Sequence, residues 1–153
     1  MSDPDADPKA RLAREQTAAL KAGEKTRLGA LRLLSAAVKN REVELRHPLN
    51  EEEFVEVAGR EAKRRREAIE AYEGAGREDR AALEREELEV LSTYLPAALG
   101  DDEVAALVEE AISATGASGS GDMGKVMGHV MARAKGRADG KAVQALVRSR
   151  LAG

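Results

Sequence analysis

The chain has 153 residues, of which 42% are hydrophobic but only 2% aromatic, and its formal net charge is -3. A core filled by Leu, Val, Ala, Ile and Met favours packed helices over sheets, so we expect an all-α fold. With no cysteine and only two histidines, His47 and His129, the sequence excludes disulfides and thiolate chemistry and predicts neither a metal site nor a cofactor.

Residues 1–8 contain three Asp and two Pro and are expected to be disordered. They include no apolar run, so the sequence predicts neither a signal peptide nor a membrane span. We therefore expect a cytoplasmic protein without a membrane partner.

Residues 9–97 are predicted to form an N-terminal subdomain of four helices, at about residues 9–21, 24–46, 51–73 and 77–95. Gly23 ends the first helix, Pro48 follows the second, and Asn50 caps the third. The first helix is expected to bury one face, made of Leu12, Ala13, Gln16, Ala19 and Leu20.

The run Lys63–Arg66 spreads positive charge around the third helix, because four consecutive helical residues cannot share a face. We interpret the run as a solvated helix exterior that pairs with Glu67 and Glu70, rather than as a nucleic-acid contact.

Pro96 and Gly100 mark a boundary, after which residues 98–153 are predicted to form a C-terminal module of three helices. The first begins at Asp101 and is followed by a flexible loop at residues 115–121. The second is expected to be capped by Asp122 and ended by Gly136, and Asp139 is expected to cap the third. The last two helices are expected to bury Met123, Val126, Met127, Val130, Met131, Val143, Leu146, Val147 and Leu151.

The segment Gly119–Val126 nearly matches a phosphate loop, but Val126 replaces the required hydroxyl and the preceding segment has a helical period. Nucleotide hydrolysis is therefore not expected. Gly124 and Gly128 lie four residues apart, and we expect this bare strip to pack against another helix.

No catalytic constellation is visible. His47 precedes a proline and His129 lies in an apolar helical segment, while the carboxylates are patterned as helix starts and as partners of cations one turn away. The sequence predicts no catalytic residue.

Charge is distributed unevenly along the chain. Residues 9–46 carry 10 cations and 4 anions, residues 76–110 carry 3 and 11, and residues 121–153 carry 7 and 2. Either the basic and acidic segments pair with each other, or the two basic segments line a surface for a polyanion.

The strongest candidate site is the turn Lys135–Lys141, where three cations lie beside glycines that allow close approach to the backbone. Such cations are placed to contact phosphates without reading sequence. The predicted RNA-binding residues are Lys125, Lys135, Gly136, Arg137, Gly140, Lys141 and Arg148.

Five motifs stand out together along the chain, namely RLLSAAVKN at 32–40, REAKRRRE at 60–67, EVLSTYLP at 89–96, DMGKVMG at 122–128 and GRADGK at 136–141. With these motifs the sequence resembles the YqeY-like family, which is related to the C-terminal tail domain of the B subunit of glutamine-dependent aminoacyl-tRNA amidotransferase. The resemblance covers nearly the whole chain from about Ala10, and it implies an all-helical fold ending in a three-helix tail module associated with holding tRNA.

From the residues and the resemblance we expect a non-catalytic tRNA-binding or adaptor protein. Candidate partners are tRNA, an amidotransferase and an aminoacyl-tRNA synthetase, and DNA is not expected. One alternative is an accessory component of a glutamine-dependent carbon-nitrogen ligase that amidates aminoacyl-tRNA, which rests on the resemblance alone. A third is a helical protein-interaction module that uses the acidic segment 76–110.

Overall fold

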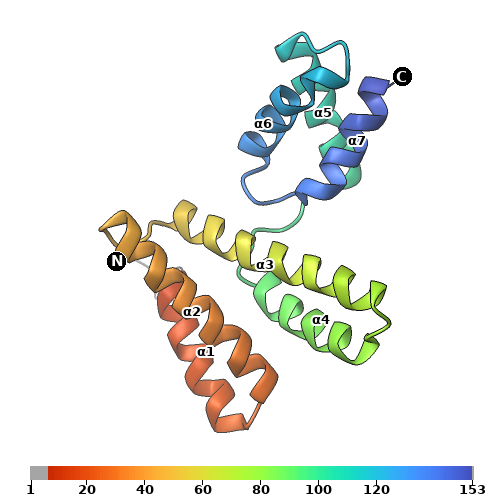
Figure 1. Ribbon diagram of the computed structural model, residues 1–153. Helices are drawn as coiled ribbons and strands as arrows, with labels where there is room; N and C mark the ends of the chain where they lie inside the picture. The colour runs from red at the N-terminus through yellow and green to blue at the C-terminus, as the bar shows by residue number, and fades with distance from the viewer. Residues whose placement is uncertain (1–6, 153) are drawn as a thin grey trace. The chain divides into compact units, whose positions relative to one another are not determined.

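The protein is all-helical in a computed structural model that describes residues 7–152, which confirms the expected fold class (Figure 1). The described residues contain no strand. The chain divides between Leu95 and Pro96 into two compact units. The elements are α1 (Pro8–Ala22), α2 (Lys25–Leu45), α3 (Glu51–Gly74) and α4 (Glu78–Ser92) in the first unit, then α5 (Asp101–Thr115), the 3-10 helix η1 (Ser120–Asp122), α6 (Met123–Ala134) and α7 (Gly140–Ala152) in the second.

The predicted disorder of residues 1–8 can be compared with the structure only at Asp7 and Pro8, because residues 1–6 lie outside the described range. Asp7 accepts a hydrogen bond from the Lys9 amide at 3.0 Å, and Pro8 is the first residue of α1. For these two residues the prediction is wrong, because an Asp cap followed by proline at the first helical position favours a helix start.

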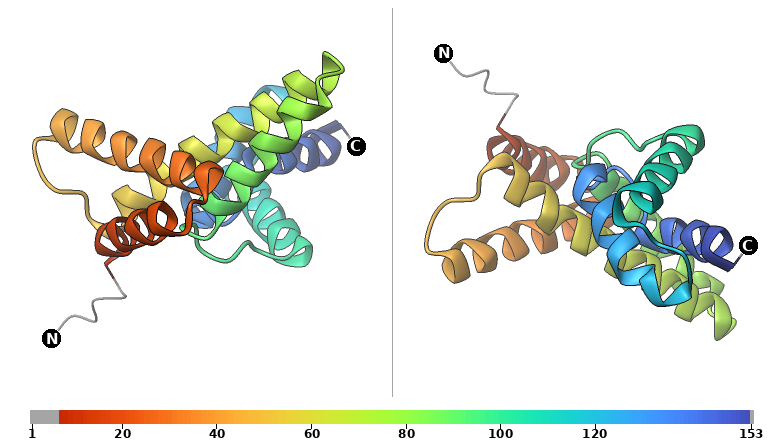
Figure 2. Two further views of the ribbon diagram at one scale, coloured as in Figure 1. Left: turned by 90° about the horizontal axis from the view of Figure 1, so that it is seen from below. Right: turned by 90° about the horizontal axis from the view of Figure 1, so that it is seen from above.

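The first unit consists of two helical hairpins, α1 with α2 and α3 with α4, which cross at an angle (Figure 2). Local chemistry sets the start of α3 as predicted, because the Asn50 side chain accepts from the Glu53 amide at 2.8 Å and Glu53 accepts from the Asn50 amide at 3.0 Å. The hairpins share one core, made of Leu12, Ala19, Leu31, Leu34, Val38, Leu49, Phe54, Val57, Ala58, Leu91 and Tyr94.

The buried face of α1 is narrower than predicted. Leu12 and Ala19 are buried, but Ala13 is exposed and Leu20 is 59% exposed. The helix packs mainly along α2, so only a thin stripe of its surface is covered.

Arg65 in α3 is buried rather than part of a solvated exterior. Its Nε atom lies 2.8 Å from the Glu87 carboxylate and 3.5 Å from that of Glu84, both on α4, and its Nη2 atom lies 4.0 Å from Glu61. The exterior interpretation of the run is wrong at this position, because α4 packs over this face of α3. Burial raises the pKa of the Glu87 carboxyl, and the neighbouring Glu84 charge adds to this rise while Arg65 opposes it.

A second polar cluster ties α1 to the end of α4 and the start of α2. Glu15 receives hydrogen bonds from Arg11 at 2.6 Å, from Tyr94 Oη at 2.8 Å and from Arg27 at 2.9 Å. The Arg11 guanidinium lies 4.2 Å from the centre of the Tyr94 ring and also donates to the Thr93 carbonyl at 2.8 Å. Burial opposes ionisation of Glu15, but the hydrogen bonds from Arg11 and Tyr94 outweigh it and lower the pKa of this carboxyl.

The second unit packs α5, α6 and α7 around a core of small side chains, and α6 and α7 bury the predicted faces. Three methionines of α6 surround this core, and no polar side chain is buried in the described part of the unit. The buried core residues are Val108, Ala111, Val126, Val130, Val143 and Val147.

Two of the three predicted helix ends in this unit differ in detail. Asp122 occupies the N-cap position of α6 as predicted, but at φ -94 and ψ 4 its side chain makes no capping hydrogen bond, and its carboxylate instead accepts from the Ser118 amide at 3.1 Å. Helix α6 ends at Ala134, one residue earlier than a stop at Gly136 requires, with Lys135 as its C-cap. The Asp139 cap is confirmed, since its carboxylate accepts from the Lys141 amide at 3.3 Å.

Candidate nucleic-acid interface

The turn between α6 and α7 contains two consecutive residues of left-handed backbone. Lys135 has φ 48 and Gly136 has φ 79, a conformation that glycine adopts without strain and that lysine adopts rarely. The Arg137 amide then donates to the Ala134 carbonyl at 2.9 Å and closes the turn. The backbone geometry therefore places the exposed Lys135 side chain at the end of α6.

Arg137 fastens this turn to the connector that precedes α5. Its Nε atom donates to the Ala97 carbonyl at 2.9 Å, and its own carbonyl accepts from the Leu99 amide at 2.7 Å. Ala97 and Leu99 could not be predicted as partners, because they take part through backbone groups and no side-chain pattern in the sequence marks them. Arg137 thus has a structural role in addition to any contact with a ligand.

Five of the seven predicted RNA-binding residues lie together in this turn, namely Lys135, Gly136, Arg137, Gly140 and Lys141. The other two lie apart. Lys125 is in the first turn of α6, about 15 Å from Lys135 along the helix axis, and Arg148 lies about 10 Å along α7 from Lys141. All five cations in the set are exposed.

Several cations of the second unit pair with carboxylates. Arg133 lies 3.2 Å from Glu110, Arg150 pairs with Glu109, and Lys125 lies 3.9 Å from Asp122. The two glutamates belong to α5, within the acidic segment, so acidic and basic segments do pair here. Lys135 and Arg148 make no such pair within the part of the chain that the structure describes.

The glycine strip of α6 does not pack against another helix. A methyl group at Gly124 or Gly128 would meet no neighbouring atom within 4 Å, and both glycines are exposed. The packing prediction is wrong, because α6 turns its valine face toward α5 and α7 and its glycine face away from them.

The two histidines do not form a catalytic set. His47 lies in the loop before α3, with Nε2 3.3 Å from Glu53. His129 is half-buried on α6, with Nε2 4.0 Å from Glu110. Among residues 7–152, no group of three or more acidic or histidine side chains is arranged to hold a metal ion.

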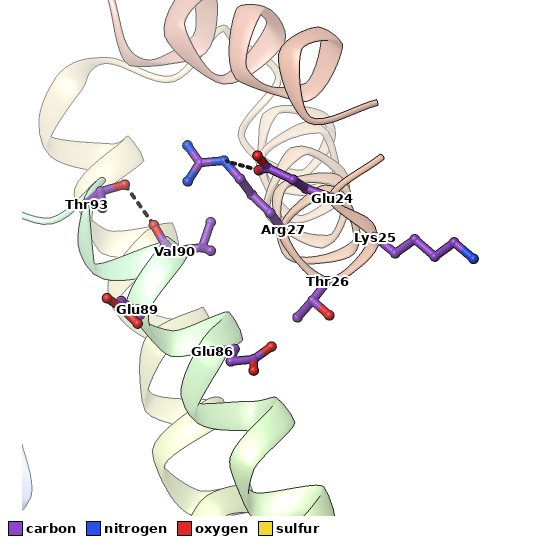
Figure 3. A pocket seen from close by; sticks show the side chains of 8 residues that line it. All are labelled: Glu24, Lys25, Thr26, Arg27, Glu86, Glu89, Val90 and Thr93. Carbon is purple, nitrogen blue, oxygen red and sulfur yellow. Dashed lines mark hydrogen bonds and ion pairs between the residues drawn. The ribbon is translucent and has the colours of Figure 1, made fainter. Parts of the chain in front are cut away.

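An open hollow of about 450 Å³ lies in the first unit, between the start of α2 and the surface of α4 (Figure 3). Glu24 and Arg27 form an ion pair of 3.7 Å at its rim, and the Lys25 side chain extends away from it. Its lining holds no histidine and no activated nucleophile, so it supports no catalytic assignment. The lining residues are Glu24, Lys25, Thr26, Arg27, Glu86, Glu89, Val90 and Thr93.

The protein is all-helical, with an exposed cationic turn between α6 and α7. Its described residues form no visible catalytic constellation. A family model described as Yqey-like protein matches residues 9–151, so the chain belongs to the Yqey-like family. A comparison with the curated proteins finds no match. None of the helices within residues 7–152 combines the length and the apolar content needed to cross a membrane.

Proposed function

We propose that this protein is a non-catalytic, cytoplasmic tRNA-binding adaptor, and that the turn between α6 and α7 contacts phosphates of the folded tRNA. The observation that carries the proposal is the pair of exposed lysines, Lys135 and Lys141, on a turn whose backbone is held by the bonds of Arg137 to Ala97 and Leu99. A turn fixed before binding loses little conformational entropy when it meets its ligand.

The lysine side chains, rather than the start of α7, make the contact in this proposal. The Asp139 carboxylate already accepts from the Lys141 amide, so a carboxylate occupies the helix start where a phosphate would otherwise sit. Lys125 and Arg148 extend the contact along α6 and α7.

The distribution of aromatic residues favours phosphate contact over the reading of single-stranded bases. Single-stranded RNA is usually held by stacking bases on aromatic side chains. The second unit contains no aromatic residue, and Phe54 and Tyr94 are buried in the core of the first. An adaptor that reads the shape of tRNA could present it to an amidotransferase or to an aminoacyl-tRNA synthetase.

The salt dependence of binding tests this proposal. Each phosphate contact adds a little under one unit to the slope of log affinity against log salt, so Lys135→Gln with Lys141→Gln should flatten the slope for unfractionated tRNA by about two units. A matched control, Lys21→Gln with Lys63→Gln, removes the same charge from exposed positions of the first unit and should change the slope less.

The comparison between the two variants decides the outcome. Equal effects would show a diffuse attraction to polyanions without a specific contact. Unchanged binding in the Lys135 and Lys141 variant would show that the turn only connects two helices. In either case the tRNA contact proposed here is wrong.

A further inference from the structure

The outer face of α2 carries a stripe on which two large apolar side chains are exposed. Leu33 is 50% exposed and Val43 is 77% exposed, although both lie within a helix that buries its opposite face. We use the name outer stripe for five residues on this face, Gly29, Leu33, Ala36, Asn40 and Val43. They follow one another at alternating intervals of four and three, the spacing of a helix that packs along a second helix.

Gly29 is half-buried, but the space in front of its α-carbon is open within the described residues. A methyl group at this position would meet no neighbouring atom within 4 Å, yet a glycine inside a helix costs about 1 kcal/mol relative to alanine. A glycine on the outer stripe allows the backbone of a second helix to approach closely.

A row of cations borders the outer stripe along one edge. Lys25, Arg32 and Lys39 follow at intervals of seven residues, about 10 Å apart along α2, and Arg46 comes seven residues later as the C-cap of the helix. All four are exposed, and within the described residues none of their side chains makes a hydrogen bond or ion pair. Arg27 and Arg41, elsewhere on α2, are by contrast paired with glutamates. We call these four residues the cationic row.

The other edge of the stripe carries an exposed carboxylate, Glu44, which pairs with Arg41 of the same helix at 2.8 Å. Ala30 is buried and Ala37 is half-buried, so the rest of this edge lies against the body of the first unit. A helix docked on the outer stripe would therefore meet exposed charge mainly on the side of the cationic row.

We propose that the outer stripe and the cationic row dock an amphipathic helix of a partner protein, one whose apolar stripe is bordered by carboxylates. The partner's apolar side chains cover Leu33 and Val43, and its carboxylates pair with the cationic row. RNA phosphates would pair with the cations but would leave the two large apolar side chains exposed to water. A second copy packed antiparallel through this face would set one cationic row against the other.

The proposal concerns α2 of the first unit and stands independently of the tRNA contact proposed for the second unit. Its test uses the full chain and a fluorescein-labelled synthetic peptide of about three heptads, with Leu at positions a and d and Glu at e and g. The like charges of this peptide prevent it from pairing with itself at neutral pH. Fluorescence anisotropy should show saturable binding of this peptide and none of a matched peptide with Lys at e and g.

Substitutions on the outer stripe should weaken this binding. Leu33→Ser with Val43→Ser should raise the Kd about tenfold or more, because two apolar side chains are no longer covered. Leu20→Ser, a similarly exposed leucine on α1, is the matched control and should leave the Kd unchanged. All three positions are exposed, so melting temperatures should stay close to that of the natural chain.

Charge substitutions give a second, independent measurement. Arg32→Gln with Lys39→Gln should weaken peptide binding more than the control pair Lys21→Gln with Lys63→Gln. The proposal is overturned if the peptide does not bind, or if Leu20→Ser weakens binding as much as the substitutions on the outer stripe.

Two further results would replace the partner helix with another occupant. If tRNA binding depends on Arg32 and Lys39 while peptide binding does not, the cationic row is a phosphate contact. If sedimentation shows a dimer that Leu33→Ser with Val43→Ser dissociates, the outer stripe covers a second copy of this chain. Either result overturns the proposal.

Discussion

The cores of the two units of this protein are built from different side chains and different polar interactions. The first unit uses long helices and an aromatic pair, with the rings of Phe54 and Tyr94 6.1 Å apart, and it fixes its helices by two polar clusters around Arg65 and Glu15. The second unit uses shorter helices around a valine core, without a buried polar side chain in its described residues.

The two units therefore differ in the interactions that hold their helices in place. In the first unit, charged side chains link helices that are far apart in sequence, such as α1 with the end of α4. In the second unit, the shape of the core and the backbone hydrogen bonds of the turns hold the helices together with exposed ion pairs that join α5 to α6 and α7, and the lysines are exposed.

The largest expected effect tests whether the units are independently stable. Phe54→Ala removes the largest fully buried side chain of the first unit and should cost about 3 to 5 kcal/mol of its free energy of unfolding. Amide hydrogen exchange should then show lost protection in α1 to α4 and unchanged protection in α5 to α7. If protection falls in both units together, they unfold as one cooperative body and the contrast between them has no thermodynamic meaning.

A smaller effect distinguishes the two polar clusters of the first unit. Glu15→Gln weakens hydrogen bonds from two guanidinium groups and Tyr94, and should cost about 1 to 2 kcal/mol at neutral pH. The folded-state pKa of Glu15 lies below the ordinary 4.5, so its carboxylate contributes stability above that pH. The cost of the substitution should therefore shrink as the pH falls below about 4.5.

Glu87 should show the opposite sign. Its folded-state pKa is raised above 4.5 by burial, so the folded state binds a proton more readily than the unfolded chain does. As the pH falls through the window just above 4.5, the natural chain should gain stability relative to Glu87→Gln. Urea unfolding at a series of pH values measures both variants, and parallel pH profiles would contradict the distinction drawn between the clusters.

The parts of the fold that the sequence predicted correctly depend on interactions between neighbours in the chain. The capping pair of Asn50 and Glu53 and the Asp139 cap each involve residues within one helical turn. Two of the failures, at Arg65 and at the glycines of α6, involve contacts between distant segments. The burial of Arg65 depends on where α4 packs, which residues 63–66 do not encode by themselves.

The candidate site follows the same division. The sequence indicated that Lys135, Gly136 and Lys141 share a turn, because they are neighbours in the chain. It could not indicate that Arg137 is bonded to the connector at Ala97, or that the valine face of α6 turns its glycines outward. A glycine pair at an interval of four is compatible with a packed face and with an open one, and only the tertiary arrangement decides between them.

The smallest expected effect tests that open strip. Gly128→Ala places a methyl group where no neighbouring atom lies within 4 Å, so the second unit should gain about 0.5 to 1 kcal/mol from the better helix propensity of alanine. Gly116→Ala is the matched control in the same unit, and it should destabilise because Gly116 ends α5 at φ 67. Thermal unfolding followed by circular dichroism measures both changes, and a lower melting temperature for Gly128→Ala would restore the packing interpretation. If stability rises while affinity for tRNA falls, the glycines of α6 form a surface that RNA approaches closely. In that case the second unit is less stable with glycine than with alanine at this position, and the glycine is needed for RNA binding.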